Sequence, residues 1–216
     1  SDGYTALTSA AFYGHPAVLL RLLRAGADMT LRTAQGKTAL QIAKEKGLTE
    51  CVAAVRTFLG EVAAARRNAA AVEAGGAGAD GGAASGKGAA AAPTAASSSG
   101  GVESGTGEDA VPEEVVEAAV QGGEAVLAWL DGGGRVDATF THKGVSGITL
   151  LMGAAFYGHE RLAVALLQRG ASINLQDSNG CTALMFAAHY GHPAVVLRLL
   201  RAGADMTLRS SGRTAL

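Results

Sequence analysis

The sequence predicts an all-α solenoid, built from stacked pairs of short helices in two blocks. Three observations indicate this fold: helix signals recur about every 33 residues, one long stretch occurs twice, and a tract poor in large apolar residues separates the blocks. The two copies, 1–32 and 178–209, are identical at 26 of 32 positions. A fixed period of this length is typical of a repeat array, because one helix pair cannot bury both of its apolar faces alone.

Each unit contains signals for two consecutive helices. In the second copy, Thr182 is a suitable N-cap for a helix beginning at Ala183, and Gly191 stands where that helix should end. Pro193 suits the first turn of a second helix, which Gly203 should end. Apolar residues recur at helical spacing in both segments, so each helix has a face to bury against a neighbour.

The repeated pattern resembles the ankyrin repeat. Gly-x-Thr-x-Leu, Ala-Ala, Gly-His, Leu-Leu and Gly-Ala recur in register, and the resemblance covers everything but one Ala/Gly-rich segment. It implies an ankyrin-repeat solenoid of helix-turn-helix units. The family's Thr-Pro-Leu-His is replaced by Thr-Ala-Leu-Thr at 5–8, Thr-Leu-Leu-Met at 149–152 and Thr-Ala-Leu-Met at 182–185. Because the hydrogen bond between that Thr and His is then absent, we expect a less stable array.

Composition divides the chain into three parts. Residues 1–67 form the first block, with two units, the second of which has the polar character of a C-terminal cap. Residues 68–110 form an Ala/Gly/Ser linker, which buries too little to offset the entropy of ordering, so we predict that it is disordered. Residues 111–216 form the second block, with an N-terminal cap unit, two full units and a truncated fourth.

Charge and cysteine content argue against several classes of protein. A net charge of −1 is not that of a nucleic-acid-binding protein. No run approaches the roughly 18–20 apolar residues of a membrane span. Cys51 and Cys181 lack the spacing of zinc ligands and fit structural thiols in a reducing compartment, so we expect a cytoplasmic protein.

No pattern indicates a catalytic site, a cofactor or a metal. The spellings GxGxxG and GxxxxGK within 76–88 lack a flanking strand and helix, so we do not expect nucleotide binding. The recurring His15, His159 and His192 would lie one unit apart, too far to share an ion at ligand distances of roughly 2 Å. We predict instead that each one hydrogen-bonds to backbone at the turn between helices. The chain is therefore expected to be non-enzymatic, without a cofactor.

The resemblance implies a protein-interaction module that binds a protein partner through the concave groove and fingers of the array. Aromatic or histidine side chains occupy the same two positions in three units. The resemblance implies that these positions lie on the inner helix and face the groove, where exposed rings would contact a partner. Packing of these rings in the core is the alternative. Three long polar side chains at the start of the fingers would give the groove a basic edge. The predicted partner-binding residues are Tyr4, Phe12, Tyr13, Arg32, His142, Lys143, Phe156, Tyr157, Gln176, His189, Tyr190 and Arg209.

Two alternatives for the function stay open. The chain could be the targeting or regulatory region of a larger enzyme, of kinase or ubiquitin-ligase type, or a scaffold without a single partner. The sequence does not identify the partner, because such surfaces recognise shape and not a transferable code.

One finger of the second block is longer than the others. Twelve residues separate Asp137 from Thr149, whereas eight separate Asn174 from Thr182. Insertions in repeat proteins map to loops, often on the binding face, so we expect the extra residues of 138–146 to extend this finger.

The repeat order suggests that the two blocks dock. The unit at 178–209 has an apolar face on its C-terminal side, and its near-copy at 1–32 has a bare N-terminal side. We predict that the first block stacks behind the second as a continuous array of about five units in permuted order. An exchange of blocks between two chains, giving a swapped dimer, is the alternative.

Overall fold

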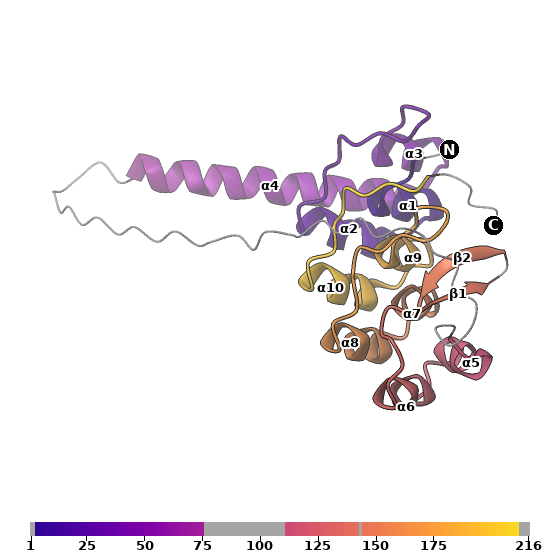
Figure 1. Cartoon of the computed structure of the whole chain (residues 1–216). Helices are drawn as coiled ribbons and strands as arrows, with labels where there is room; N and C mark the ends of the chain where they lie inside the picture. Colours follow the sequence, from indigo (N-terminus) through magenta and orange to yellow (C-terminus); the bar gives the residue numbers. More distant parts are fainter. Residues whose placement is uncertain (1–2, 76–110, 143, 212–216) are drawn as a thin grey trace.

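The structure is a computed structural model that describes residues 3–75, 111–142 and 144–211, and its helices form stacked pairs (Figure 1). The inner helices are α1 (Ala6–Tyr13), α3 (Ala39–Glu45), α5 (Glu113–Gln121), α7 (Leu150–Tyr157) and α9 (Ala183–His189). The outer helices are α2 (Pro16–Arg24), α4 (Thr49–Gly75), α6 (Ala125–Asp131), α8 (Glu160–Gln168) and α10 (Pro193–Arg201). Two antiparallel strands, β1 (Thr139–His142) and β2 (Val145–Thr149), complete the fold.

Helix boundaries follow the predicted caps. The side chains of Thr5, Thr149 and Thr182 each accept a hydrogen bond from the backbone N–H three residues later, at the starts of α1, α7 and α9. Pro16 and Pro193 open α2 and α10, where the missing N–H costs no helical hydrogen bond. The two helices of each unit therefore begin where the sequence indicates.

The first turn of α1 has a substitute for the missing Thr–His hydrogen bond. The Thr8 hydroxyl accepts from the Thr5 backbone N–H at 2.8 Å and donates to the Thr5 carbonyl at 3.1 Å. In α7 the Met152 sulfur takes the acceptor role, 3.5 Å from the Thr149 nitrogen. The argument for a less stable array, which depended on an unreplaced hydrogen bond, therefore does not apply to these two helices.

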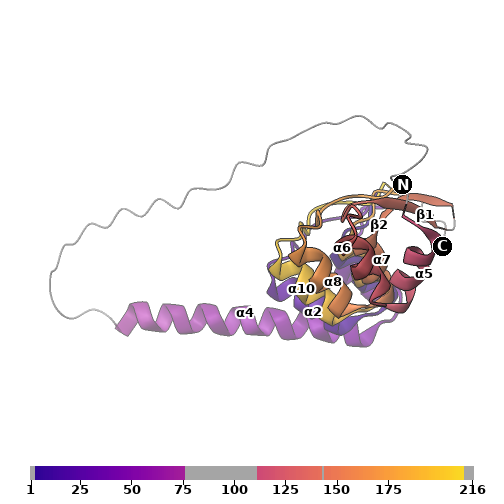
Figure 2. The ribbon, with the colours of Figure 1, turned by 60° about the horizontal axis from the view of Figure 1, so that its bottom comes forward.

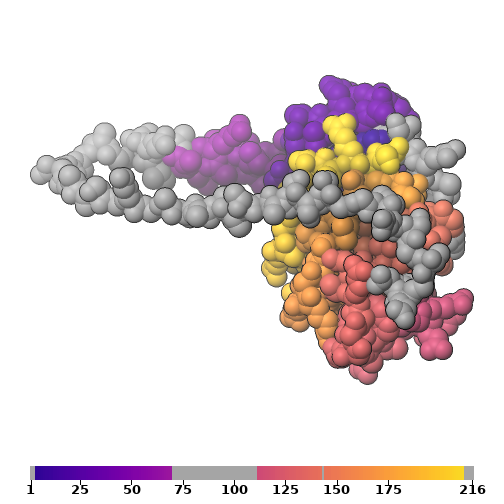
Figure 3. Space-filling model, viewed as in Figure 1, coloured from indigo at the N-terminus to yellow at the C-terminus, as the bar shows by residue number. Residues whose placement is uncertain are grey.

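The helix pairs stack in an order that differs from the chain order. Among the inner helices, α5 contacts α7, α7 contacts α9, α9 contacts α1, and α1 contacts α3. In the outer layer α8 contacts α10, α10 contacts α2, and α2 contacts α4. The first block thus stacks behind α9 and α10, and the predicted permuted array is confirmed. In Figure 3 the indigo first block continues the stack directly beyond the yellow segment that follows α10.

The same histidine contact joins consecutive units, whether or not the chain connects them. In each case a histidine follows the first helix of a unit. Its Nε2 donates to a backbone carbonyl near the end of the first helix of the preceding unit in the stack. Because a carbonyl oxygen only accepts, Nε2 carries the proton. The pairs are His159 with the Val120 carbonyl at 2.6 Å, His192 with Phe156 at 2.9 Å and His15 with His189 at 2.7 Å. The predicted backbone hydrogen bonds are confirmed, and the structure adds that they link neighbouring units.

One finger is assembled from the two blocks. Within a continuous finger, the Asp177 backbone N–H donates to the Cys181 carbonyl at 3.0 Å. At the joint between the blocks, the N–H of Ser210 donates to the carbonyl of Tyr4 at the same 3.0 Å, although 206 residues separate them in sequence. The junction thus reproduces the register of an uninterrupted array.

The helix α4 extends into the segment predicted as a linker. It continues to Gly75, eight residues beyond the predicted boundary at 67, and projects past the stack (Figure 2). The local sequence Asn-Ala-Ala-Ala-Val-Glu-Ala explains this, since alanine has the highest helix propensity and the glycine-rich tract begins only afterwards. The rest of the predicted linker, 76–110, lies outside the described residues.

The long finger is a β-hairpin, so the all-α prediction gains a two-stranded sheet. Thr139 pairs with Thr149 and Phe140 with Ile148. The Phe140 and Ile148 side chains pack against the hydrophobic core, which anchors the hairpin to α7. In the described part of the chain, no helix is long and apolar enough to cross a membrane.

Candidate functional site

Aromatic rings from the last turns of three inner helices form a continuous row across the joint between the blocks. The ring centroids of Tyr13 and His189 are 3.7 Å apart, and those of His189 and Tyr190 are 4.4 Å apart. The ring centroids of Tyr190 and Phe156 are 4.1 Å apart, and those of Phe156 and Tyr157 are 4.6 Å apart. Neighbouring rings of the row are in contact, so the repeated positions meet as one surface.

The row continues on the first block through Phe12. Its ring makes edge contacts with Tyr13 at 5.0 Å and with Tyr4 at 5.5 Å. The Lys46 ammonium lies 3.2 Å from the Phe12 ring centroid and also donates to the Phe12 carbonyl. The six residues predicted for the inner helices and the predicted finger residue Tyr4 are therefore in one cluster.

The side chains of the row are only partly buried. Tyr13 is 43% exposed, and Tyr4, Phe12, Phe156, Tyr157, His189 and Tyr190 are half-buried. Burial lowers the pKa of His189 to about 4, helped by the charge of nearby His15, so His189 is neutral at neutral pH. Packing thus holds each ring in place while an edge or face stays open to solvent.

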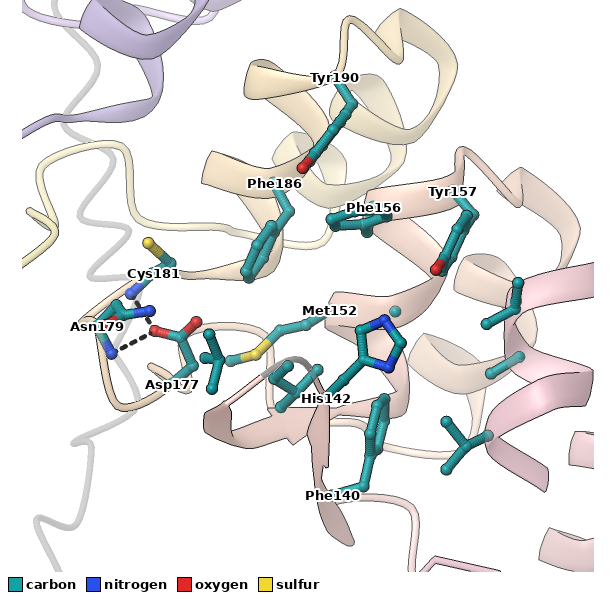
Figure 4. A pocket seen from close by; sticks show the side chains of 16 residues that line it. Phe140, His142, Met152, Phe156, Tyr157, Asp177, Asn179, Cys181, Phe186 and Tyr190 are labelled. Carbon is teal, nitrogen blue, oxygen red and sulfur yellow. Dashed lines mark hydrogen bonds between the residues drawn. The ribbon is translucent and has the colours of Figure 1, made fainter. Parts of the chain in front are cut away.

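A groove of about 150 Å³ lies beside this row, between the hairpin, α5, α7 and α9 (Figure 4). Its walls are mainly apolar side chains from all four elements. Predicted residues His142, Phe156, Tyr157 and Tyr190 are among those that line it. The remaining lining residues were not predicted from the sequence; they are Val116, Ala119, Val120, Phe140, Val145, Ile148, Met152, Gly153, Asp177, Asn179, Cys181 and Phe186.

Asp177 is the one carboxylate among the groove-lining residues. One of its oxygens, Oδ1, accepts from the backbone N–H of Asn179 at 2.9 Å and from that of Cys181 at 2.8 Å. Burial raises the pKa of Asp177, and these two hydrogen bonds act against that rise. A comparison of units could have revealed it, since Thr33 and Ser210 occupy the equivalent position.

The three predicted finger residues are tied to backbone carbonyls. Gln176 Nε2 donates to the carbonyls of Gly180 at 2.7 Å and Arg209 at 3.1 Å. The Arg209 guanidinium donates to the Arg32 carbonyl at 2.8 Å, and that of Arg32 donates to the Gly36 carbonyl at 2.7 Å. These side chains link successive fingers while remaining exposed. Lys143, another predicted partner-binding residue, lies outside the described residues.

The described residues offer little for metal or thiol chemistry. Among them, no group of three His, Cys, Asp or Glu side chains is arranged to hold a metal ion. Cys51 and Cys181 are buried free thiols. Burial, with a contribution from the Asp177 charge, raises the pKa of Cys181 to about 12, so it is not a ready nucleophile.

The stacked units and their groove define a helical repeat protein. A family model for ankyrin repeats in three copies matches residues 116–210, and a model for a single ankyrin repeat matches residues 2–34. The two matches together cover more than half of the chain, which belongs to the ankyrin-repeat family. A comparison with curated proteins gives no match. Ankyrin repeats are generally protein–protein interaction modules, and proteins built from them are typically non-catalytic.

Proposed function

We propose that this chain is a non-enzymatic module that binds a partner protein through the aromatic row and the adjacent fingers. The observation that carries the proposal is the continuity of the row, which crosses from the second block to the first through the Tyr13–His189 contact. Large, preordered aromatic side chains supply contact area at low entropy cost, and they are enriched where binding energy concentrates.

Tyr13 provides the sharpest test because it is the most exposed ring of the row. The full chain is immobilised, binding peptides are selected from a random dodecapeptide library displayed on phage, and their affinities are measured by fluorescence polarisation. Tyr13→Ala should weaken binding by about 1–3 kcal/mol, roughly 5- to 150-fold. Helicity by circular dichroism should be unchanged.

Leu59 offers a matched control on the outer helix α4. It is 44% exposed, nearly the same as Tyr13 at 43%, yet it lies outside the aromatic row. Leu59→Ala should leave peptide affinity unchanged. Equal losses in the two variants, or a loss of helicity that parallels the loss of binding in Tyr13→Ala, would contradict the proposal.

A further inference from the structure

The groove contains two buried polar atoms that have no hydrogen-bond partner among the described residues. They are Oδ2 of Asp177 and Nε2 of His142. Asp177 as a whole is only 7% exposed. Figure 4 shows its second oxygen turned away from the hydrogen-bonded turn, with the hairpin and its His142 ring on the other side of the groove. A buried carboxylate oxygen without a partner is unfavourable, so its presence calls for a physical reason.

The finger turn itself does not need a carboxylate. At the equivalent position of the first block, Thr33 closes the turn by donating its N–H to the Lys37 carbonyl at 2.9 Å, and its hydroxyl accepts from the Lys37 N–H. At the joint between the blocks, the Ser210 hydroxyl accepts from the Tyr4 N–H at 3.1 Å. A single hydroxyl oxygen therefore serves this turn in two other fingers. The second carboxylate oxygen of Asp177 is not required for the fold.

The hairpin that faces Asp177 is also peculiar to this part of the array. It is the finger lengthened by four residues, and it brings His142 and Phe140 to the groove. Between these side chains and α9, the walls are apolar, with Ile148, Met152 and Phe186 among them. A cavity of about 150 Å³ with apolar walls holds a group the size of a benzene ring. One large apolar side chain fits this space.

We propose that the groove binds a segment of the partner protein that inserts one large apolar side chain and places an adjacent lysine or arginine cation against Asp177. This inference rests on the proposed function and specifies what the surface recognises. The cation would supply the partner that Oδ2 lacks, and His142 Nε2 would meet a backbone group of the same segment.

The chain's own tract between the blocks does not supply such a segment. Its one cation in 69–109 is Lys87, which glycines flank on both sides, and the nearest large apolar residue is more than ten positions away. The occupant that we propose is a partner chain that carries both features close together.

The test compares the binding of the selected peptides to the full chain and to two single-residue variants. Asp177→Ser installs the residue that Ser210 provides at the joint, which keeps one oxygen for the turn and removes the carboxylate. Asp205→Asn is the control, because Asp205 also accepts from a turn N–H two residues later, at 2.7 Å, but is exposed and does not line the groove. Affinities are measured by fluorescence polarisation, and stability is followed by thermal melting.

Selected peptides should contain a lysine or arginine within two positions of a large apolar residue. Asp177→Ser should weaken their binding at least about tenfold, while Asp205→Asn should change it little. Replacing the peptide's cation by norleucine should lower its affinity for the wild-type chain by the same factor. The same replacement should not lower the affinity for Asp177→Ser any further. The melting temperature of Asp177→Ser should stay the same or rise, because an unpaired buried charge is lost.

Other outcomes overturn the inference. If Tyr13→Ala weakens peptide binding but Asp177→Ser leaves the affinity unchanged, the proposed function stands and this inference is wrong. If no peptide is enriched, both fail. Should Asp177→Ser not fold, Asp177→Asn decides, since its amide oxygen can accept the two turn hydrogen bonds while an NH₂ group replaces Oδ2. Undiminished binding to that variant refutes the inference.

Discussion

Gly191 should be the residue at the joint least tolerant of a methyl group. It has a φ of +74°, and a Cβ added there would lie 2.5 Å from Nδ1 and 3.0 Å from Cγ of His15. The left-handed backbone alone costs alanine about 1–2 kcal/mol. Displacement of the His15 ring breaks its hydrogen bond to the His189 carbonyl, a further loss of about 1 kcal/mol. We expect Gly191→Ala to lower the free energy of unfolding by about 2–3 kcal/mol.

Gly203 separates the two contributions. It has a φ of +89°, but an added Cβ there would meet no atom within 4 Å. Gly203→Ala should therefore show only the backbone cost of about 1–2 kcal/mol. The free energies are measured by urea unfolding of the full chain.

A double-mutant cycle links the effect to the joint. When His15 is already alanine, Gly191→Ala should cost no more than Gly203→Ala, a coupling of about 1 kcal/mol. If Gly191→Ala and Gly203→Ala are equally destabilising in the wild-type background, the ring does not pack against Gly191, and the reasoning is refuted.

Three other expected outcomes test the packing of the blocks, the hairpin and the pH response. Segments 1–75 and 111–216, expressed separately and mixed, should give saturable heat by titration calorimetry and a higher melting temperature than either alone; no heat would mean that the blocks do not dock in solution. Phe140→Ala should lower the melting temperature, because the ring packs against the core, and an unchanged value would show that the hairpin is not anchored. The pKa of His189 is about 4 in the folded chain and near 6.5 when unfolded, so the unfolded state binds the extra proton and stability should fall as pH drops from about 6.5 to 4. His189→Gln should flatten that part of the stability profile, and an identical slope in the variant would assign it to another group.

The helical units could be predicted because local chemistry determines them. Thr182 caps α9 and Pro193 opens α10 with no help from distant residues. The period of 33 residues then places equivalent positions side by side, which is why the aromatic row could be expected from sequence. Partner binding by those residues stays a prediction.

The groove could not be predicted in the same way. Asp177 was not among the predicted residues, because its importance lies in what surrounds its second oxygen. The extended finger was expected, but the pairing of its strands was not, since the pairing of Phe140 with Ile148 depends on a core that α7 completes. The helix α4 crosses the predicted block boundary at 67 and ends at Gly75, because a composition boundary does not mark where an alanine-rich helix stops.

The sequence by itself determined the repeat, the helix pairs and the bare faces that make the first block stack behind the second. These follow from periodicity and capping, which act within a few residues of the chain. Only the tertiary structure decided that His15 reaches the His189 carbonyl, that Ser210 and Tyr4 complete one finger, and that Oδ2 of Asp177 has no hydrogen-bond partner among the described residues. The physical reason is that hydrogen-bond satisfaction and burial depend on which atoms meet in space, and here those atoms come from segments up to 206 residues apart.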